Sequence, residues 1–150
     1  MNCLGLKSRL LEVLRKQLEE TVRNFKAVIE DAQKSANEYG APKDRYDSFR
    51  MQLLRKKDMF SQQLAKVNEQ ADVLERISID QELKKVEFGA LIFTKKQKIF
   101  VSIGLGRIEM DNEVYFAISP NVPIYKAMEG LKVGDDFKFR DEVIRIESIC

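Results

Sequence analysis

The chain has 150 residues, of which 44% are hydrophobic and 33% are charged, and its formal net charge is +2. This length corresponds to one ordinary domain or two small ones, and so small a net charge excludes a general polyanion binder. Histidine is absent, which excludes Ser-His-Asp triads, histidine metal sites and histidine general bases, so that any metal is expected to be held by oxygen.

The N-terminal segment runs directly into a charged amphipathic pattern and lacks a signal-peptide core, and no stretch is long and apolar enough to span a bilayer. The two cysteines, Cys3 and Cys150, lie at opposite ends of the sequence without a partner spacing. We therefore expect neither a disulfide framework nor a thiolate zinc site, and we interpret the compartment as a reducing cytoplasm.

Apolar residues recur every seven positions in two blocks of the N-terminal half, with companion apolar residues at the intervening three- or four-residue steps. The spacing keeps one seam of a helix facing a partner helix, which is the requirement of a coiled coil. Gly40 and Pro42 separate the blocks and end the first helix. The sequence therefore predicts an antiparallel helical hairpin over residues 1–80, on the order of 45 Å long, with its tip near 37–45. The two blocks are Leu4, Leu11, Leu18, Phe25 and Ala32, and Tyr46, Leu53, Phe60, Val67 and Leu74.

After Asp80 the periodicity changes to that of strands. Residues 88–94 and 99–103 flank a polar turn and predict a β-hairpin, and a turn at 111–113 leads into a strand at 114–118. Pro123 to Gly130 predicts a short helix. A turn at 135–136 is expected to lead into residues 137–139, and residues 143–149 alternate as one closing strand. These elements predict a small α+β domain at 81–150 on a mostly antiparallel sheet.

Two segments of this half resemble the C-terminal domain of the bacterial Gre transcript-cleavage factors, the GreA/GreB family of transcription elongation factors. They are Val86–Ala90, followed by a hairpin, and Ala117–Asp136, with its serine-proline step, short helix and Val-Gly-Asp turn. Nearer the middle of the chain, Tyr46 and Arg50 match the tyrosine-to-arginine segment of that family. The resemblance implies an antiparallel coiled coil followed by an FKBP-like domain.

The resemblance also implies a function. Family members bind bacterial RNA polymerase, insert the hairpin into its secondary channel and help hold a second Mg²⁺, so that the polymerase cleaves backtracked RNA. Such a protein is an accessory factor rather than an enzyme, and we expect a cytoplasmic monomer that contacts the nascent RNA 3′ end. Mg²⁺ takes hard oxygen ligands, which one or two carboxylates can supply while the host provides the others.

Glu38 and Asp44 flank the predicted turn, and we expect them to take the catalytic and metal-ligating roles. Tyr46 and Arg50, which match the family, and Lys43 near the tip are expected to contact the channel or RNA. The acidic run of the family is absent here, and other readings stay open. Asp44 is well placed as an N-cap, and Glu38 fits a solvated helix end. Lys43 and Arg45 weaken the local negative potential. The alternative functions are a non-cleaving secondary-channel regulator or inhibitor and a coiled-coil adaptor.

Two further surfaces are candidates. The basic run at 55–57 is either a phosphate-contacting patch or a solvated face paired with Glu19, Glu20 and Asp31 on the first helix. Residues around the short helix at 123–130 form either a polymerase-docking patch or part of the core. The docking candidates are Ser119, Pro120, Pro123 and Ile124.

Overall fold

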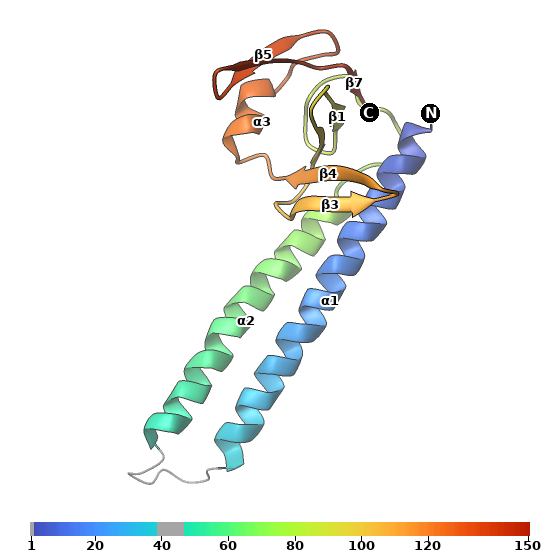
Figure 1. The fold of residues 1–150 in the computed structure, drawn as a ribbon. Coiled ribbons are helices and arrows are strands. Elements are labelled where there is room, and N and C mark those ends of the chain that lie inside the picture. Colours follow the sequence, from blue (N-terminus) through green and yellow to red (C-terminus); the bar gives the residue numbers. More distant parts are fainter. Residues whose placement is uncertain (1, 39–46) are drawn as a thin grey trace. The chain divides into compact units, whose positions relative to one another are not determined.

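The computed structural model describes residues 2–38 and 47–150 and divides them into two compact units, one containing residues up to 15 together with 73–150 and the other containing 16–72. Helix α1 spans Cys3–Glu38 and helix α2 spans Asp47–Glu75 (Figure 1). Neither glycine nor proline occurs between residues 6 and 39 or between 43 and 88, so that nothing in the sequence breaks either helix. The predicted pair of long helices is confirmed.

The unit of residues 16–72 is an antiparallel helix pair. The rings of Phe25 and Phe60 meet edge to face with their centroids 5.5 Å apart, and Lys57 Nζ donates a hydrogen bond of 2.7 Å to Gln33 Oε1 across the pair. The predicted seam positions of this unit are buried or half-buried, because one apolar stripe on each helix excludes water from the other. They are Leu18, Phe25, Ala32, Leu53, Phe60 and Val67.

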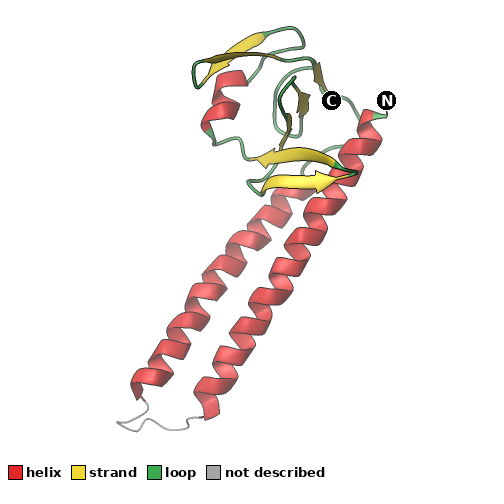
Figure 2. Cartoon of the chain, in the orientation of Figure 1, coloured by secondary structure: helices red, strands yellow, loops and turns green. Residues whose placement is uncertain are grey.

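The other unit contains a five-stranded sheet in the order β3-β4-β2-β1-β7 and a separate two-stranded sheet of β5 and β6 (Figure 2). Only the β2–β4 pair is parallel, and every other pair is antiparallel, as predicted. The short helix α3, Pro123–Met128, follows β4 of the large sheet and precedes β5 of the small sheet in the sequence. The strands are β1 Leu91–Phe93, β2 Lys98–Val101, β3 Gly106–Met110, β4 Glu113–Ile118, β5 Asp136–Phe139, β6 Glu142–Arg145 and β7 Ser148–Ile149.

The prediction of a single closing strand over 143–149 is wrong. The chain leaves the small sheet after β6 and enters the large sheet at β7, where Glu147 N donates to Phe93 O at 2.8 Å. Ile146 lies at the crossing, fully buried, and its backbone bonds to Gly134 and Asp135 instead of to either sheet. The alternating pattern therefore hides the crossing, since Ile144 before it and Ile149 after it both pack against the core.

One core unites the strands with α3. Its members are buried apolar side chains from both sheets and from the helix, packed together with half-buried neighbours that include Val122 and Ile124. The loop between β4 and α3 lies at the margin of this core. The buried members are Val86, Ala90, Ile92, Ile99, Val101, Tyr125, Met128, Phe137 and Ile146.

Candidate functional site

Glu38 is the last residue of α1, and its side chain is exposed to solvent. The last turn of α1 contains no basic residue, so no side chain of that turn offsets the partial negative charge of the helix C-terminus. Unpaired backbone carbonyls at a helix end are hard oxygen ligands, like the carboxylate itself. The end of α1 is therefore an electrostatically suitable place for a divalent cation.

Three of the predicted site residues, Lys43, Asp44 and Tyr46, lie outside the described residues, as does Arg45. The choice between metal ligation and N-capping for Asp44 therefore stays a prediction. Only Glu38 and Arg50 of the predicted tip set lie within the described part of the chain.

Arg50 lies in the first turn of α2 and is half-buried. Its Nε is buried and finds no hydrogen-bond partner among the described residues. A cation near a helix N-terminus is unfavourable, because the partial charge of that helix end is also positive. Within the described residues, no hydrogen bond to Nε offsets the burial of the Arg50 side chain. An anionic partner such as a phosphate would satisfy it.

The basic run on α2 is not paired with acidic side chains as the alternative reading required. Lys57 bonds to the amide of Gln33, and no ion pair joins Arg55 or Lys56 to Glu19, Glu20 or Asp31 in the described residues. Arg55 and Lys56 are exposed. Their positive charges are therefore exposed on α2 and form no ion pair within the described part of the chain.

Sequence reasoning missed two exposed methionines on α2, Met51 and Met59, each with 49% of its surface accessible. Both lie outside the heptad positions of the helix seam, and this was the only feature of the sequence that indicated their exposure. Flexible thioether side chains of this kind contact irregular partner surfaces readily.

The predicted docking patch divides between core and surface. Ile124 packs against the domain core, and Ser119 and Pro120 are half-buried, while Pro123 is exposed. The Ser119 hydroxyl accepts a hydrogen bond of 3.3 Å from Asn121 N, which shapes the loop before α3. Tyr125, their neighbour, is a core residue.

A cavity of about 330 Å³ lies beside the β5–β6 hairpin, and charged side chains that form ion pairs line its rim. Arg145 Nε donates to Asp136 Oδ1 at 2.9 Å, and this hydrogen bond lowers the pKa of the Asp136 carboxyl. Lys96 Nζ pairs with Glu142 at 2.7 Å. Asp136 is the only carboxylate among the described residues that line the cavity, and it is paired with Arg145, so the lining contains no carboxylate cluster.

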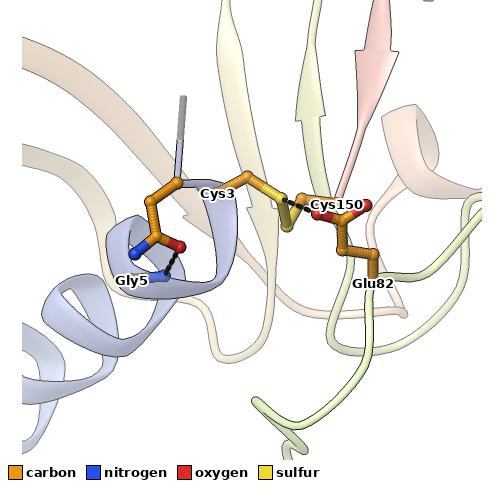
Figure 3. Close-up of a disulfide and its surroundings, with 5 residues drawn as sticks. Cys3, Gly5, Glu82 and Cys150 are labelled. Atoms are coloured by element: carbon orange, nitrogen blue, oxygen red, sulfur yellow. Dashed lines mark hydrogen bonds between the residues drawn. A yellow bond between two sulfur atoms is a disulfide. The ribbon is translucent and has the colours of Figure 1, made fainter.

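The expectation that the cysteines stay unpaired is wrong. Cys3 and Cys150 form a disulfide with their Cα atoms 6.1 Å apart, although 147 positions separate them in the sequence (Figure 3). Cys3 opens α1, where Asn2 caps the helix by accepting a hydrogen bond of 3.0 Å from Gly5 N. Cys150 follows β7 and pairs with Leu91 through two backbone hydrogen bonds. The fold brings the two ends together, which no local spacing could indicate.

Lys7, one turn after Cys3 on α1, is completely buried, and its Nζ has no hydrogen-bond partner among the described residues. Burial lowers the pKa of Lys7 from its ordinary 10.5, and Glu82 and Glu87 act in the opposite direction. A buried ammonium without a partner destabilises the folded state.

Replacing Lys7 with methionine is expected to raise the free energy of unfolding at neutral pH by about 1 kcal/mol, because the variant removes an unsatisfied buried cation. Between the lowered pKa of Lys7 and 10.5, the unfolded wild-type chain binds more protons than the folded chain. Wild-type stability therefore gains relative to Lys7→Met as pH rises through this window.

Parallel urea denaturations of both proteins from neutral pH to 10.5 measure this difference. Burial, aided by Glu129 and Glu87, raises the pKa of Tyr125, which opposes the trend above pH 10.0 but cancels in the comparison. A difference that stays constant with pH would contradict the assignment to Lys7.

No protein-family model and no curated protein matches the chain. Among solved structures, the GreA factor homolog 1 (Gfh1) protein of Thermus thermophilus is 16% identical and has a TM-score of 0.34, with 93% of this chain and 94% of that chain covered. Gfh1 of Thermus aquaticus is 18% identical at the same TM-score, with 92% and 94% covered. Likenesses this distant carry no argument about function. Among the described helices, none is long and apolar enough to cross a membrane.

Proposed function

We propose that this protein is a Gre-like transcription elongation factor. It binds bacterial RNA polymerase, inserts its helical hairpin into the secondary channel and promotes cleavage of backtracked RNA. The observation that carries the proposal is the antiparallel helix pair of residues 16–72, with Glu38 ending α1 only nine positions before α2 begins at Asp47. A pair of helices is narrow enough to enter a channel that leads to an enclosed active site.

The electrostatics at the end of α1 support a role for Mg²⁺. Glu38 adds a full negative charge to the partial charge of the helix C-terminus, and no basic side chain of that turn offsets it. Mg²⁺ keeps several waters and is held by one or two carboxylates, so Glu38 and Asp44 would share the ion with carboxylates of the polymerase. The factor itself is not an enzyme. It stimulates the hydrolytic activity of the polymerase.

Positive charge on α2 suits the nascent RNA 3′ end. Arg50, whose Nε has no hydrogen-bond partner among the described residues, would contact phosphates together with the exposed Arg55 and Lys56. Lys43 and Tyr46 would complete the channel contacts. Such contacts supply affinity without sequence preference. Ser119, Pro120, Pro123 and Ile124, around the short helix α3, would dock on the polymerase, and the factor would be cytoplasmic and monomeric.

A non-cleaving secondary-channel regulator is the second candidate. Lys43 and Arg45 flank Asp44 in the sequence, and two cations beside a carboxylate reduce its attraction for a metal ion. This protein would compete for the channel without cutting RNA.

Cleavage of a stalled, backtracked complex of the cognate polymerase at fixed Mg²⁺ tests the proposal. Wild-type protein is expected to release short 3′ RNA fragments, and Glu38→Ala and Asp44→Ala are each expected to slow release by about tenfold for every ~1.4 kcal/mol of transition-state stabilisation lost. Glu30→Ala is the matched control, since this exposed carboxylate lies two turns before Glu38 on the same helix.

The other outcomes separate the alternatives. Absence of cleavage together with competition against a known channel-binding factor would establish the non-cleaving regulator. Absence of both activities, with a concentration-dependent dimer in sedimentation, would overturn the polymerase proposal in favour of a coiled-coil adaptor.

A further inference from the structure

Cys3, Glu82 and Cys150 form a cluster of three potential metal ligands. One donor atom from each residue lies within 4.8 Å of the other two, and all three belong to the same compact unit. Cys3 is half-buried at the start of α1, Cys150 is buried after β7, and Glu82 is exposed on the segment before β1. Figure 3 shows the carboxylate of Glu82 directed at the two sulfur atoms.

The disulfide offers the carboxylate of Glu82 no hydrogen-bond donor. Its Oε1 lies 3.4 Å from Cys3 Sγ, but a disulfide sulfur carries no hydrogen atom to donate to a carboxylate. No other side-chain hydrogen bond or ion pair of Glu82 is found among the described residues. Attraction to the ammonium group of Lys7 favours the position of this carboxylate, and the disulfide sulfur adds no hydrogen bond to it.

A shared metal ion accounts for this contact. Tetrahedral zinc has bonds of about 2.3 Å to thiolates and about 2.0–2.2 Å to carboxylates, which places neighbouring sulfur and oxygen ligands about 3.5 Å apart. The distance of 3.4 Å between Cys3 Sγ and Glu82 Oε1 agrees with this geometry. Once the disulfide is opened, rotation of the two cysteine side chains separates the sulfur atoms to the roughly 3.8 Å that two zinc ligands require.

The charges around the cluster also fit. Two thiolates, one carboxylate and a divalent cation have a net charge of −1, and Lys7 lies one turn after Cys3 on the same face of α1. Lys7 is the buried residue whose Nζ lacks a partner in the described part of the oxidised chain. The helix N-terminus at Cys3 adds partial positive charge beside one thiolate.

We propose that, in its reduced form, this chain holds one divalent zinc-class cation between the thiolates of Cys3 and Cys150 and the carboxylate of Glu82, with the fourth position open to water. Two equivalents of a thiol reductant convert the disulfide to two thiols and are themselves oxidised to a disulfide. Metal binding then releases the two thiol protons to solvent. The exposed Glu82 leaves a path for the ion to enter, and the site does not depend on the polymerase proposal.

The disulfide contradicts one sequence-based expectation, and the proposed site departs from the other, that no thiolate zinc site exists. Both expectations rested on spacing along the chain, whereas the fold juxtaposes the ends. In a reducing compartment such a cysteine pair is mostly in the dithiol form. The form that is proposed to bind the metal ion would therefore predominate there.

Metal titration of the anaerobically reduced, metal-free full chain tests the site. With Zn²⁺ in competition with a chromophoric chelator, we expect one ion per chain. With Co²⁺ as the probe, we expect tetrahedral ligand-field bands and a thiolate charge-transfer band about half as intense as that of a four-thiolate site. Oxidised wild-type protein has the same sequence and is expected to bind neither ion.

Variants distinguish the ligands from the surroundings. Cys150→Ser is expected to lose at least about a hundredfold in zinc affinity and Glu82→Gln about tenfold, because each removes one ligand. Glu147→Gln, which changes an exposed carboxylate three positions before Cys150, is the control and should bind as the wild type does. Circular dichroism against reduced wild-type protein verifies the fold, and the exposed position of Glu82 keeps that variant informative if Cys150→Ser unfolds.

Three results would overturn the proposal. They are an absence of uptake by reduced wild-type protein, zinc affinity that survives both Cys150→Ser and Glu82→Gln, and a stoichiometry of one ion per two chains. The last would assign the metal to a site shared between copies.

Discussion

Reduction of the Cys3–Cys150 disulfide is expected to lower the free energy of unfolding by about 3–5 kcal/mol in metal-free buffer. The cross-link joins residues 147 positions apart, so it restrains nearly the whole unfolded chain. Chain-entropy estimates give close to 5 kcal/mol for loops of about 100 residues and rise only slowly with length, and measured values tend to be lower. A loss of this size is a large part of the stability of an ordinary domain.

Guanidinium denaturation of oxidised and reduced protein in the presence of a chelator measures the effect. The Cys3→Ser/Cys150→Ser double variant is the control. Its unfolding midpoint should match that of the reduced protein and should not change when the reductant is added. Equal midpoints for the two wild-type forms would contradict the expectation. Zinc should restore stability to the reduced wild type as its concentration exceeds the dissociation constant, but not to the double variant.

The helices could be predicted from the sequence because their pattern is local. Leu18 and Ala32 lie two heptads apart on one stripe, and each turn of the helix repeats the signal. The β1–β2 hairpin was equally readable, since its polar turn separates two apolar runs. Strand β3 was missed because Arg107 and Glu109 are polar and exposed, which leaves its two buried residues, Ile108 and Met110, as a weak signal.

Features that depend on the whole fold could not be predicted. The cysteine pairing joins the two ends of the chain, and the burial of Lys7 depends on elements more than 70 residues away in the sequence. Composition favours neither result, because lysine is almost never fully buried without a partner. The chemistry of the cluster around Cys3 was therefore invisible before the fold was known.

The candidate site at the end of the hairpin is predictable only in outline. Heptad registers locate the end of α1 and so place Glu38 at a helix C-terminus with its negative potential. They do not fix which of the neighbouring carboxylates converge, since that depends on the backbone of residues 39–46, which lie outside the described residues. The assignment of Asp44 stays a prediction for the cleavage assay.

Replacing Ile146 with alanine is expected to lower the free energy of unfolding by about 2–5 kcal/mol. Ile146 is fully buried at the point where the chain crosses from the small sheet to the large one, and it belongs to the core shared by α3 and both sheets. Truncation leaves a cavity that the surrounding structure fills only in part, because backbone hydrogen bonds with Gly134 and Asp135 hold the crossing in place. The loss should therefore lie toward the upper part of this range.

Val143→Ala is the matched control, since Val143 lies three residues earlier in β6 and 71% of its surface is exposed. Its loss is expected to stay within about 0.5 kcal/mol, because an exposed side chain forfeits little apolar burial. Chemical denaturation of the oxidised proteins compares the two variants on one scale. Equal losses for the two variants would contradict the placement of Ile146 in the shared core and of Val143 at the surface.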